Sequence, residues 1–358
     1  VDTTGSSLCT WSYVQCADRH GQERVVTLNL KNVQLNGTLP SEIDGLTALE
    51  TLDVSANELT GNIPSSIGNL TQLTDLVLEM NLFVGPLPAS FGHLRNLTFL
   101  SFGFNKLTGE LPAVYGQLSR LRTLKGDYNQ LQGNLPTELG DMTSLVYLIL
   151  SYNQFTGPIP SSIGRLQNLF DLELHNNYFT CIPPEVSNLG QLTSLSLGFN
   201  LLSGPIPDSL GTMKRLVGLF LENNQLNGTI PPSLGQLKTL RQLELDHNLL
   251  VGTVPLSLLA LTALETFHLE HNHMDGVLPE GLGANMTAVV SFGMSNNAFQ
   301  GPIPTSVEAF VCKYLAVSKS RQCLMGGNLF SRSDCAANPC IAKFCGACKA
   351  KFQVPKNL

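Results

Sequence analysis

Acidic side chains and histidines recur along the chain at spacings of about 24 residues, and these residue types can bind cations and transfer protons. Glu244 and His268 are separated by one such spacing, and so are Asp246 and Glu270. Such a set could hold a metal ion or a cationic peptide whose binding responds to pH, whereas the simpler interpretation is a solvated charged face. The full set comprises Asp171, Glu173, His175, Glu222, Glu244, Asp246, His247, His268, Glu270 and His271.

Two short strings resemble reactive motifs but have simpler interpretations. The string HNH, from His271 to His273, is typical of some nucleases, yet its central Asn272 belongs to a repeated phrase. The string CGAC, from Cys345 to Cys348, could be a redox pair or half of a zinc site, although structural disulfides are favoured in a cysteine-rich tail. The sequence contains no phosphate-binding loop, nucleophile elbow or paired-carboxylate cleft. We therefore predict a protein that is not an enzyme and has no catalytic residue, cofactor or metal site.

A repeated phrase positions these residues. Leu-x-Leu-x-x-Asn returns in steps of about 24 residues, with a slightly shorter step into Asn200 and a slightly longer one into Asn297. An earlier copy has Val33 in place of Asn, which gives twelve repeats within residues 25–304. Cysteine-containing caps are expected at residues 1–24 and 305–358. The repeat asparagines are Asn57, Asn81, Asn105, Asn129, Asn153, Asn177, Asn200, Asn224, Asn248, Asn272 and Asn297.

The phrase has a direct physical interpretation. Leucines at alternate positions place one side of a short strand in a core, and the Asn amide can bond the backbone of neighbouring turns. The following Leu-x-x-Leu segment should pack the opposite wall as a short helix or 3-10 turn. Stacked repeats bury apolar faces that no single repeat could bury. We predict an α/β solenoid: a curved right-handed superhelix with a parallel concave β-sheet, 3-10 or short helices on its convex side, and disulfide-stapled caps.

The position before each repeat Asn forms a column on the expected concave face, and aromatic residues gather in it. Phe104, Tyr128 and Tyr152 occupy consecutive repeats, so their rings should stack about 5 Å apart. Phe199 occupies the same column in a later repeat. A cluster of exposed aromatic side chains is typical of an interaction surface, although rings that lie flat over the backbone would simply add stability.

The neighbouring column contains glycines, at Gly103 and Gly198, which should leave a notch beside each phenylalanine. Aromatic residues in further columns extend the cluster. We favour ligand binding by this surface. The predicted ligand-binding residues are Phe99, Phe104, Asp127, Tyr128, Tyr147, Tyr152, Glu173, His175, Phe199, Phe220 and Glu222.

Cysteines and glycosylation sequons indicate the compartment in which the protein is found. The ends of the chain are rich in cysteine and the middle is nearly free of it, which is typical of a capped repeat protein in an oxidising compartment. Five Asn-x-Thr sequons agree with a secreted or cell-surface glycoprotein. The predicted disulfide cysteines are Cys9, Cys16, Cys312, Cys323, Cys335, Cys340, Cys345 and Cys348, and the pairing of the last six is open. The predicted glycosylation sites are Asn36, Asn69, Asn96, Asn227 and Asn285.

Cys181 is the one cysteine between the two ends. It stands where the repeat has Gly, in a repeat shortened by one residue. We predict a buried free thiol there, with an intermolecular disulfide as the alternative. The net charge of −6 argues against a nucleic-acid partner. No apolar run is long enough to cross a membrane, so membrane attachment would need an anchor not present in this chain. The start at Val1 is expected of a mature, processed chain.

The phrase LxxLxxLxLxxNxLxGxIPxxLGxL resembles the plant-type leucine-rich repeat of receptor-kinase ectodomains and polygalacturonase-inhibiting proteins. The string CTWSYVQC, from Cys9 to Cys16, is similar to the amino-terminal cap of that family, with Tyr13 in place of the usual Gly. The ending CLMGGNLF looks more like that of protist and other non-plant members. The resemblance covers roughly residues 9 to 304 and implies receptor-like binding or inhibition of a foreign glycosidase.

These observations predict an extracellular interaction module that binds a peptide, protein or glycan on its concave face. The alternative is a structural subunit of an extracellular matrix, wall or filament, which would assemble with copies of itself through solenoid flanks and caps. A monomer in solution would favour the first prediction, and reproducible multimers or fibres would favour the second.

Overall fold

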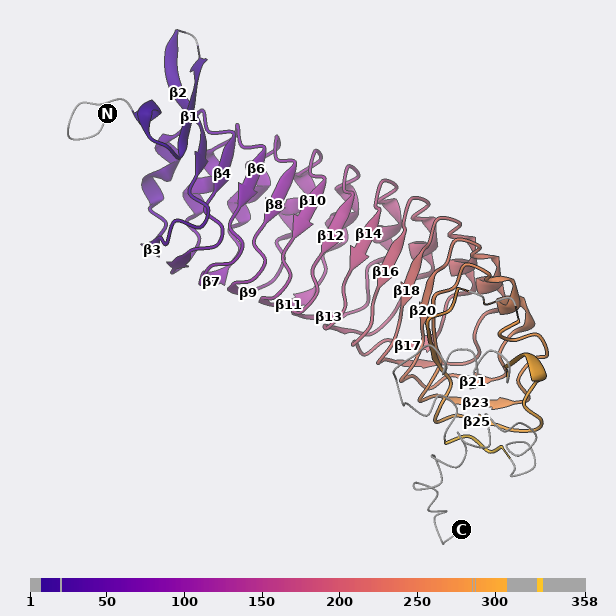
Figure 1. Ribbon diagram of the computed structural model, residues 1–358. Coiled ribbons are helices and arrows are strands. Elements are labelled where there is room, and N and C mark those ends of the chain that lie inside the picture. The colour runs from indigo at the N-terminus through magenta and orange to yellow at the C-terminus, as the bar shows by residue number, and fades with distance from the viewer. Residues whose placement is uncertain (1–7, 20, 285, 287, 308–326, 331–358) are drawn as a thin grey trace, which may run out of the picture. The chain divides into compact units, whose positions relative to one another are not determined.

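The computed structural model describes residues 8–19, 21–284, 286, 288–307 and 327–330. It consists of two compact units, Val1–Leu192 and Thr193–Leu358, and each is a run of strand, turn and 3-10 helix (Figure 1). Some predicted residues lie outside the described part. These are Asn285, Cys312, Cys323, Cys335, Cys340, Cys345 and Cys348.

The first unit begins with a disulfide-linked hairpin. Cys9 in η1 (Leu8–Thr10) is bonded to Cys16 in β1 (Val14–Arg19), which confirms the predicted pair. β1 runs antiparallel to β2 (Gln22–Asn29), and β2 pairs in parallel with the next strand. The row continues with β4 (Thr51–Asp53), β6 (Asp75–Val77), β8 (Phe99–Ser101), β10 (Thr123–Lys125), β12 (Tyr147–Ile149) and β14 (Asp171–Glu173).

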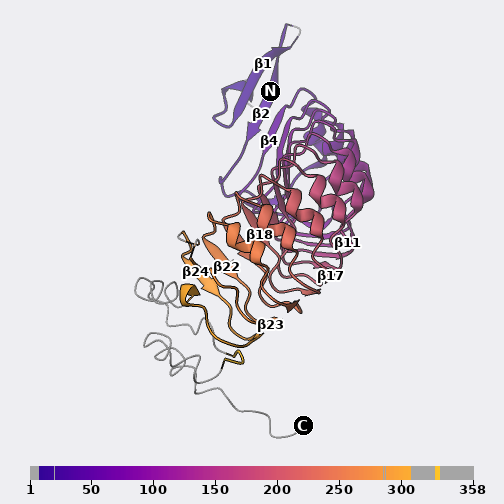
Figure 2. The same cartoon turned by 90° about the vertical axis from the view of Figure 1, so that its right-hand side faces the viewer.

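Short 3-10 helices follow the strands of the first unit. Figure 2 shows them stacked on the side away from β1, β2 and β4. A proline with φ near its fixed value precedes each one, as Pro64 does at −69°. Gly68 in η3 stays small because a Cβ there would lie 2.5 Å from the Ser90 carbonyl oxygen of the next turn. The helices are η2 (Ser41–Gly45), η3 (Ser65–Asn69), η4 (Ala89–His93), η5 (Ala113–Gln117), η6 (Thr137–Asp141), η7 (Ser161–Arg165) and η8 (Pro184–Asn188).

A second row of short strands lies after the turns of the first unit. The strands are β3 (Asn36–Thr38), β5 (Glu58–Thr60), β7 (Val84–Pro86), β9 (Lys106–Gly109), β11 (Gln130–Asn134), β13 (Gln154–Gly157) and β15 (Tyr178–Phe179). These strands pair in parallel. The longer ones, β9, β11 and β13, each bury a leucine or phenylalanine, as β13 buries Phe155.

The repeat asparagines form a ladder between neighbouring repeats. Asn153 is buried, and its Nδ2 donates to the carbonyl oxygen of Gly126 in the preceding repeat at 2.9 Å. Its Oδ1 accepts from the Leu131 N–H at 3.0 Å. Equivalent bonds recur at Asn81 and Asn105, which confirms that the amide satisfies the backbone of neighbouring turns.

The second unit repeats the same plan. Its Asn ladder includes Asn328, whose Oδ1 accepts from the Phe299 N–H at 3.2 Å and whose Nδ2 donates to the Met294 carbonyl oxygen at 3.0 Å.

The main strands of the second unit are β16 (Ser194–Ser196), β18 (Gly218–Phe220), β20 (Gln242–Glu244), β22 (Thr266–His268) and β24 (Ser291–Gly293). The second row has β17 (Ser203–Pro205), β19 (Gln225–Asn227), β21 (Val251–Gly252), β23 (His273–Gly276) and β25 (Ala298–Phe299). The 3-10 helices are η9 (Asp208–Thr212), η10 (Pro232–Gln236) and η11 (Leu256–Ala260). Within the described residues, no helix is both long and apolar enough to span a bilayer.

Candidate functional site

The solvent-exposed side of the sheet from β4 to β14, here called the strand face, carries a continuous row of rings. Phe104 and Tyr128 stack with ring centroids 4.4 Å apart, and Tyr128 and Tyr152 stack at 4.1 Å. His175 meets Tyr152 edge-on at 5.3 Å. We call these four residues the ring row. The three aromatic side chains keep 39–46% of their surface exposed, so the expectation of exposed, stacked rings is confirmed.

The backbone of Phe104, Tyr128 and Tyr152 is left-handed, which the repeat pattern did not predict. Phe104, Tyr128 and Tyr152 have φ of 52–53°, and Asn176 has φ of 54°. The cause is the turn out of each strand, where the N–H of the residue before the repeat Asn donates to the next repeat, as Phe104 N–H does to the Asp127 carbonyl oxygen at 2.9 Å. The occurrence of Asn in the same column was the available signal, because Asn tolerates this conformation better than most residues.

The notch expected at Gly103 is filled. A Cβ at Gly103 would lie 2.7 Å from Oδ1 of Asp127, so the glycine makes room for the carboxylate of the next repeat. Gly198 does the same for Glu222 in the second unit. The prediction of an open notch beside each phenylalanine is therefore wrong. The glycines seat an acidic group next to the ring column instead.

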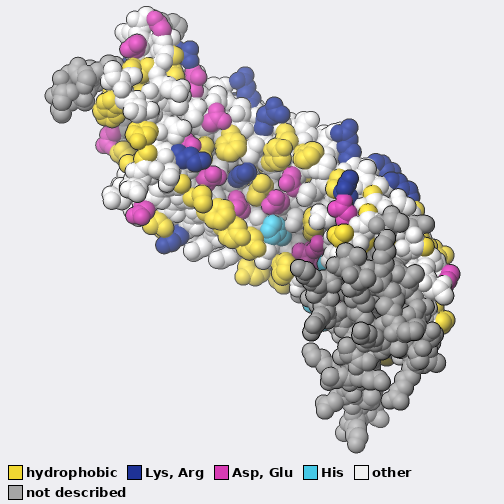
Figure 3. Space-filling view, viewed as in Figure 1, with side chains coloured by type: hydrophobic (Ala, Val, Ile, Leu, Met, Phe, Trp, Pro, Cys, Tyr) yellow, Lys and Arg dark blue, Asp and Glu magenta, His cyan; other side chains and the backbone are white. Residues whose placement is uncertain are grey.

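A second aromatic group lies on β12. Tyr147, 40% exposed, meets Phe170 edge-on at 6.1 Å, and Phe170 is itself 44% exposed. Phe170 was not predicted, because it precedes its strand rather than alternating within it. Phe99 is half-buried and is separated from Tyr147 by Thr123, which is in register with both. Figure 3 shows hydrophobic side chains interleaved with acidic and basic ones over the face of the first unit.

Ionisable groups flank the rings. Partial burial raises the pKa of the Asp127 carboxyl, while its own backbone hydrogen bond and the charge of Lys125 oppose the rise. Partial burial also raises the pKa of Glu173, and the neighbouring charges of Asp171 and Asp127 add to it. Desolvation lowers the pKa of His175, so its imidazole is neutral near pH 7. The strand face therefore offers carboxylates, a lysine and a neutral imidazole beside the rings.

In the second unit, the predicted residues do not form a ring row. Phe199 is 49% exposed, and Phe220 lies over Gly218, where a Cβ would be 2.5 Å from Cε2 of the ring. Burial raises the pKa of Glu222 to about 7, and Glu244 and Asp246 add to the rise. After Phe199, the column before the Asn ladder carries histidines and asparagines here instead of aromatic residues.

These histidines make a second stack. His247 and His271 stack with centroids 4.2 Å apart. His247 Nδ1 is 2.9 Å from Oδ2 of Asp246, and His271 Nε2 is 3.0 Å from Nδ2 of Asn296. The structure thus brings together the predicted acids and histidines of the two repeats that contain β20 and β22, as their separation by one repeat implied.

Comparisons with known proteins agree with this geometry. Residues 24–127 match the family described as a leucine-rich repeat region, and residues 144–166, 191–213 and 215–237 match the single Leucine Rich Repeat. The structure of a plant peptide hormone receptor, RGFR1 in complex with RGF2, is 34% identical, with a TM-score of 0.79, and the match covers 85% of this chain and 51% of that chain. The ectodomain of the Arabidopsis receptor kinase HAESA, in complex with an IDA peptide hormone that is lengthened at its N-terminus, is 31% identical with a TM-score of 0.75, over 91% of this chain and 54% of that one.

The chain is a plant-type leucine-rich repeat protein. It spans about half the length of these receptor structures. A plant ice-binding protein is also similar, at 25% identity and a TM-score of 0.56, over 84% of this chain and 81% of that chain. A search of curated proteins finds no match. The predicted leucine-rich-repeat solenoid is confirmed, because the chain shares both the repeat and the parallel strand row of these relatives.

The remaining predicted sites of this leucine-rich repeat protein lie off the strand face. Asn36 is on β3, Asn69 ends η3, and Asn227 is on β19, all with exposed side chains. Asn96 is partly buried and bonds the Thr71 carbonyl oxygen. Glycosylation at these positions stays a prediction.

The Cys181 thiol is exposed, so the prediction of a buried thiol is wrong. The shortened turn keeps its backbone bond, in which the Ile159 N–H donates to the Cys181 carbonyl oxygen at 3.2 Å. The side chain is therefore not needed to fill the turn.

Proposed function

We propose that this chain is a non-catalytic, extracellular interaction module that binds an extended peptide on the strand face of its first unit. The ring row carries the proposal. Exposed aromatic side chains contribute strongly to binding energy at interfaces, and three of them lie on consecutive repeats here. Receptor ectodomains that resemble the chain are described in complex with peptides, which supports the class of ligand.

The orientation of the rings favours a peptide over a glycan. Sugars pack on the faces of aromatic rings, but Tyr128 has both faces covered by Phe104 and Tyr152. What Tyr128 offers a ligand is therefore the edge of its ring and its hydroxyl group. A phenol hydroxyl can donate to a backbone carbonyl oxygen, and a ring edge can pack against apolar side chains.

The charges on the strand face suggest the composition of the peptide. Asp127 and Glu173 lie beside the rings, with Lys125 as a cationic neighbour. A peptide with apolar side chains and at least one basic residue would fit both features. The disulfide between Cys9 and Cys16, together with the exposed sequons, supports an extracellular location.

A peptide library provides the test. We would select from a phage-displayed library of random peptides on the full chain and measure the affinity of the enriched peptides for variants. Tyr128→Ala should weaken binding at least tenfold. Tyr178→Ala is the matched control, because Tyr178 is 50% exposed on β15 and lies outside the strand face.

Three results would overturn the proposal. One is a library that yields no enriched peptide, and another is equal affinity for wild type and Tyr128→Ala. The third is selective binding of the protein to a glycan array with no peptide binding. Circular dichroism of each variant shows that lost binding is not lost folding.

A further inference from the structure

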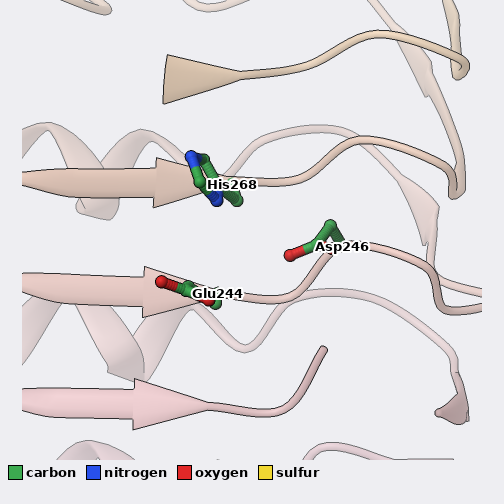
Figure 4. Close-up of side chains that lie close together, drawn as sticks. All are labelled: Glu244, Asp246 and His268. Carbon is green, nitrogen blue, oxygen red and sulfur yellow. The ribbon is translucent and has the colours of Figure 1, made fainter. Parts of the chain in front are cut away.

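Three potential ligands for a cation converge in the second unit. Glu244 and His268 project from the ends of β20 and β22, and Asp246 follows β20 by two residues (Figure 4). One ligand atom from each of the three side chains lies within 4.8 Å of the others. They come from neighbouring repeats in register, so the solenoid itself sets their separation.

Asp246 provides an independent sign of a missing partner. The residue is buried, with 9% of its surface and 12% of its side chain exposed, and its Oδ1 has no hydrogen-bond partner among the described residues. A buried carboxylate oxygen without a partner is costly, and such groups are rare in folded proteins. The other oxygen, Oδ2, is held by His247 Nδ1 at 2.9 Å, so the orientation of the carboxylate is fixed by a neighbour outside the cluster.

His268 is also fixed from outside. Its Nε2 lies 2.7 Å from the hydroxyl oxygen of Ser291 on the next strand. When Nε2 donates its proton to that hydroxyl, Nδ1 carries the lone pair that a metal ion requires. Figure 4 shows a ring nitrogen of His268 facing Glu244 and Asp246. Metal-ligating histidines are commonly oriented by such a second hydrogen bond.

The local charge is unbalanced without a cation. None of Glu244, Asp246 and Glu270 forms an ion pair with Lys or Arg among the residues that the structure describes. Glu270 Oε2 is likewise buried without a hydrogen-bond partner in that part of the chain. A dication held by two carboxylates and a neutral imidazole would cancel the two nearest negative charges.

We propose that Glu244, Asp246 and His268 form a binding site for a divalent transition-metal ion such as Zn²⁺. The mixed nitrogen and oxygen set suits zinc, whereas Ca²⁺ and Mg²⁺ prefer six or more oxygen ligands. Ligands about 2 Å from a tetrahedral zinc ion lie roughly 3.4 Å apart, so the three side chains would close by the order of 1 Å. At least one coordination position remains for water or for an atom of a bound molecule.

Calorimetry with zinc chloride tests the site. We would treat the untagged full chain with chelator, dialyse it, and titrate it with Zn²⁺. The expected result is saturable binding that weakens at least tenfold in His268→Ala and in Asp246→Asn. The double variant Glu173→Gln/His175→Ala removes the same residue types from the first unit and should bind zinc as the wild type does.

A spectroscopic arm separates this site from cysteine ligation in the tail. Co²⁺ bound by carboxylates and imidazole should lack a thiolate-to-cobalt charge-transfer band, and the visible spectrum should disappear in His268→Ala. Unchanged zinc affinity in the triple variant Glu244→Gln/Asp246→Asn/His268→Ala would overturn the proposal. So would tighter binding of Ca²⁺ than of Zn²⁺, or no binding of zinc by a wild type with a native circular dichroism spectrum.

Discussion

The Asn ladder gives the sharpest stability prediction, and Asn153→Ala is the change that tests it. In the wild type, Asn153 is 7% exposed and joins its own repeat to the preceding one. The Leu131 N–H would lose the Oδ1 acceptor, and the Gly126 carbonyl oxygen would keep only the long bond from Asn129 at 3.3 Å. By contrast, the carbonyl oxygens of Leu150 and Ser151 retain bonds from other repeats, so they contribute little to the loss.

The magnitude follows from the groups left without a partner. A buried polar group that loses its hydrogen bond costs about 1–3 kcal/mol. The Leu131 N–H would lose its acceptor and the Gly126 carbonyl oxygen would lose its shorter bond, so we expect the free energy of unfolding to fall by about 2–4 kcal/mol. Because repeats couple mainly to their neighbours, part of this loss should be concentrated near Leu131.

Two measurements check the prediction. Urea denaturation should show the loss in the free energy of unfolding, and hydrogen exchange followed by mass spectrometry should show faster exchange in the peptide that contains Leu131. The control is Gln154→Ala, because Gln154 is the exposed next residue and surface substitutions usually change the free energy of unfolding by no more than about 0.5 kcal/mol. If Asn153→Ala were as stable as Gln154→Ala, with exchange at Leu131 unchanged, the reasoning about the ladder would be refuted.

Three further predictions follow from single groups. In the folded state the pKa of Glu222 is about 7, against an ordinary value of 4.5, and the charges of Glu244 and Asp246 contribute to the rise. Ionisation of Glu222 therefore disfavours the folded state, and the free energy of unfolding should fall as pH rises from 4.5 through 7. In chelator-treated protein, Glu222→Gln should raise the free energy of unfolding by about 1 kcal/mol at pH 8 and leave it unchanged at pH 4; the figure is reduced because Glu222 is partly in contact with solvent. Equal increases at both pH values would contradict this. The exposed Cys181 thiol should react with iodoacetamide in the native protein, which peptide mapping would detect, and its absence from the labelled peptides would show that the thiol is covered. Asn328→Ala should remove the acceptor of the Phe299 N–H and speed its hydrogen exchange, and unchanged exchange there would remove Asn328 from the ladder.

The sequence predicted the repeat and its columns because both depend on local spacing. Leucines at alternate positions and one Asn per repeat determine which side chains face the core, so the stack of Phe104, Tyr128 and Tyr152 could be expected before any coordinates. The same spacing placed Glu244 beside His268. These are consequences of a register that changes little from repeat to repeat.

What the sequence missed depends on conformation rather than spacing. The left-handed backbone of Phe104, Tyr128 and Tyr152 is set by hydrogen bonds to the next repeat, and the repeat pattern alone does not encode it. The filled notch at Gly103 depends on the rotamer of Asp127. The ring that contacts Tyr147 belongs to Phe170, which lies outside the alternating strand. Asn328 was missed as a ladder residue because it follows Asn297 by clearly more than one repeat length.

The most direct test of peptide binding on the strand face is a hydrogen-exchange footprint. The full chain would be compared with and without a peptide enriched from the phage library. We expect slower exchange in the segments of β8, β10 and β12 and in the turns that carry Phe104, Tyr128 and Tyr152. Protection confined to η3 through η6, on the opposite side of the first unit, would contradict it.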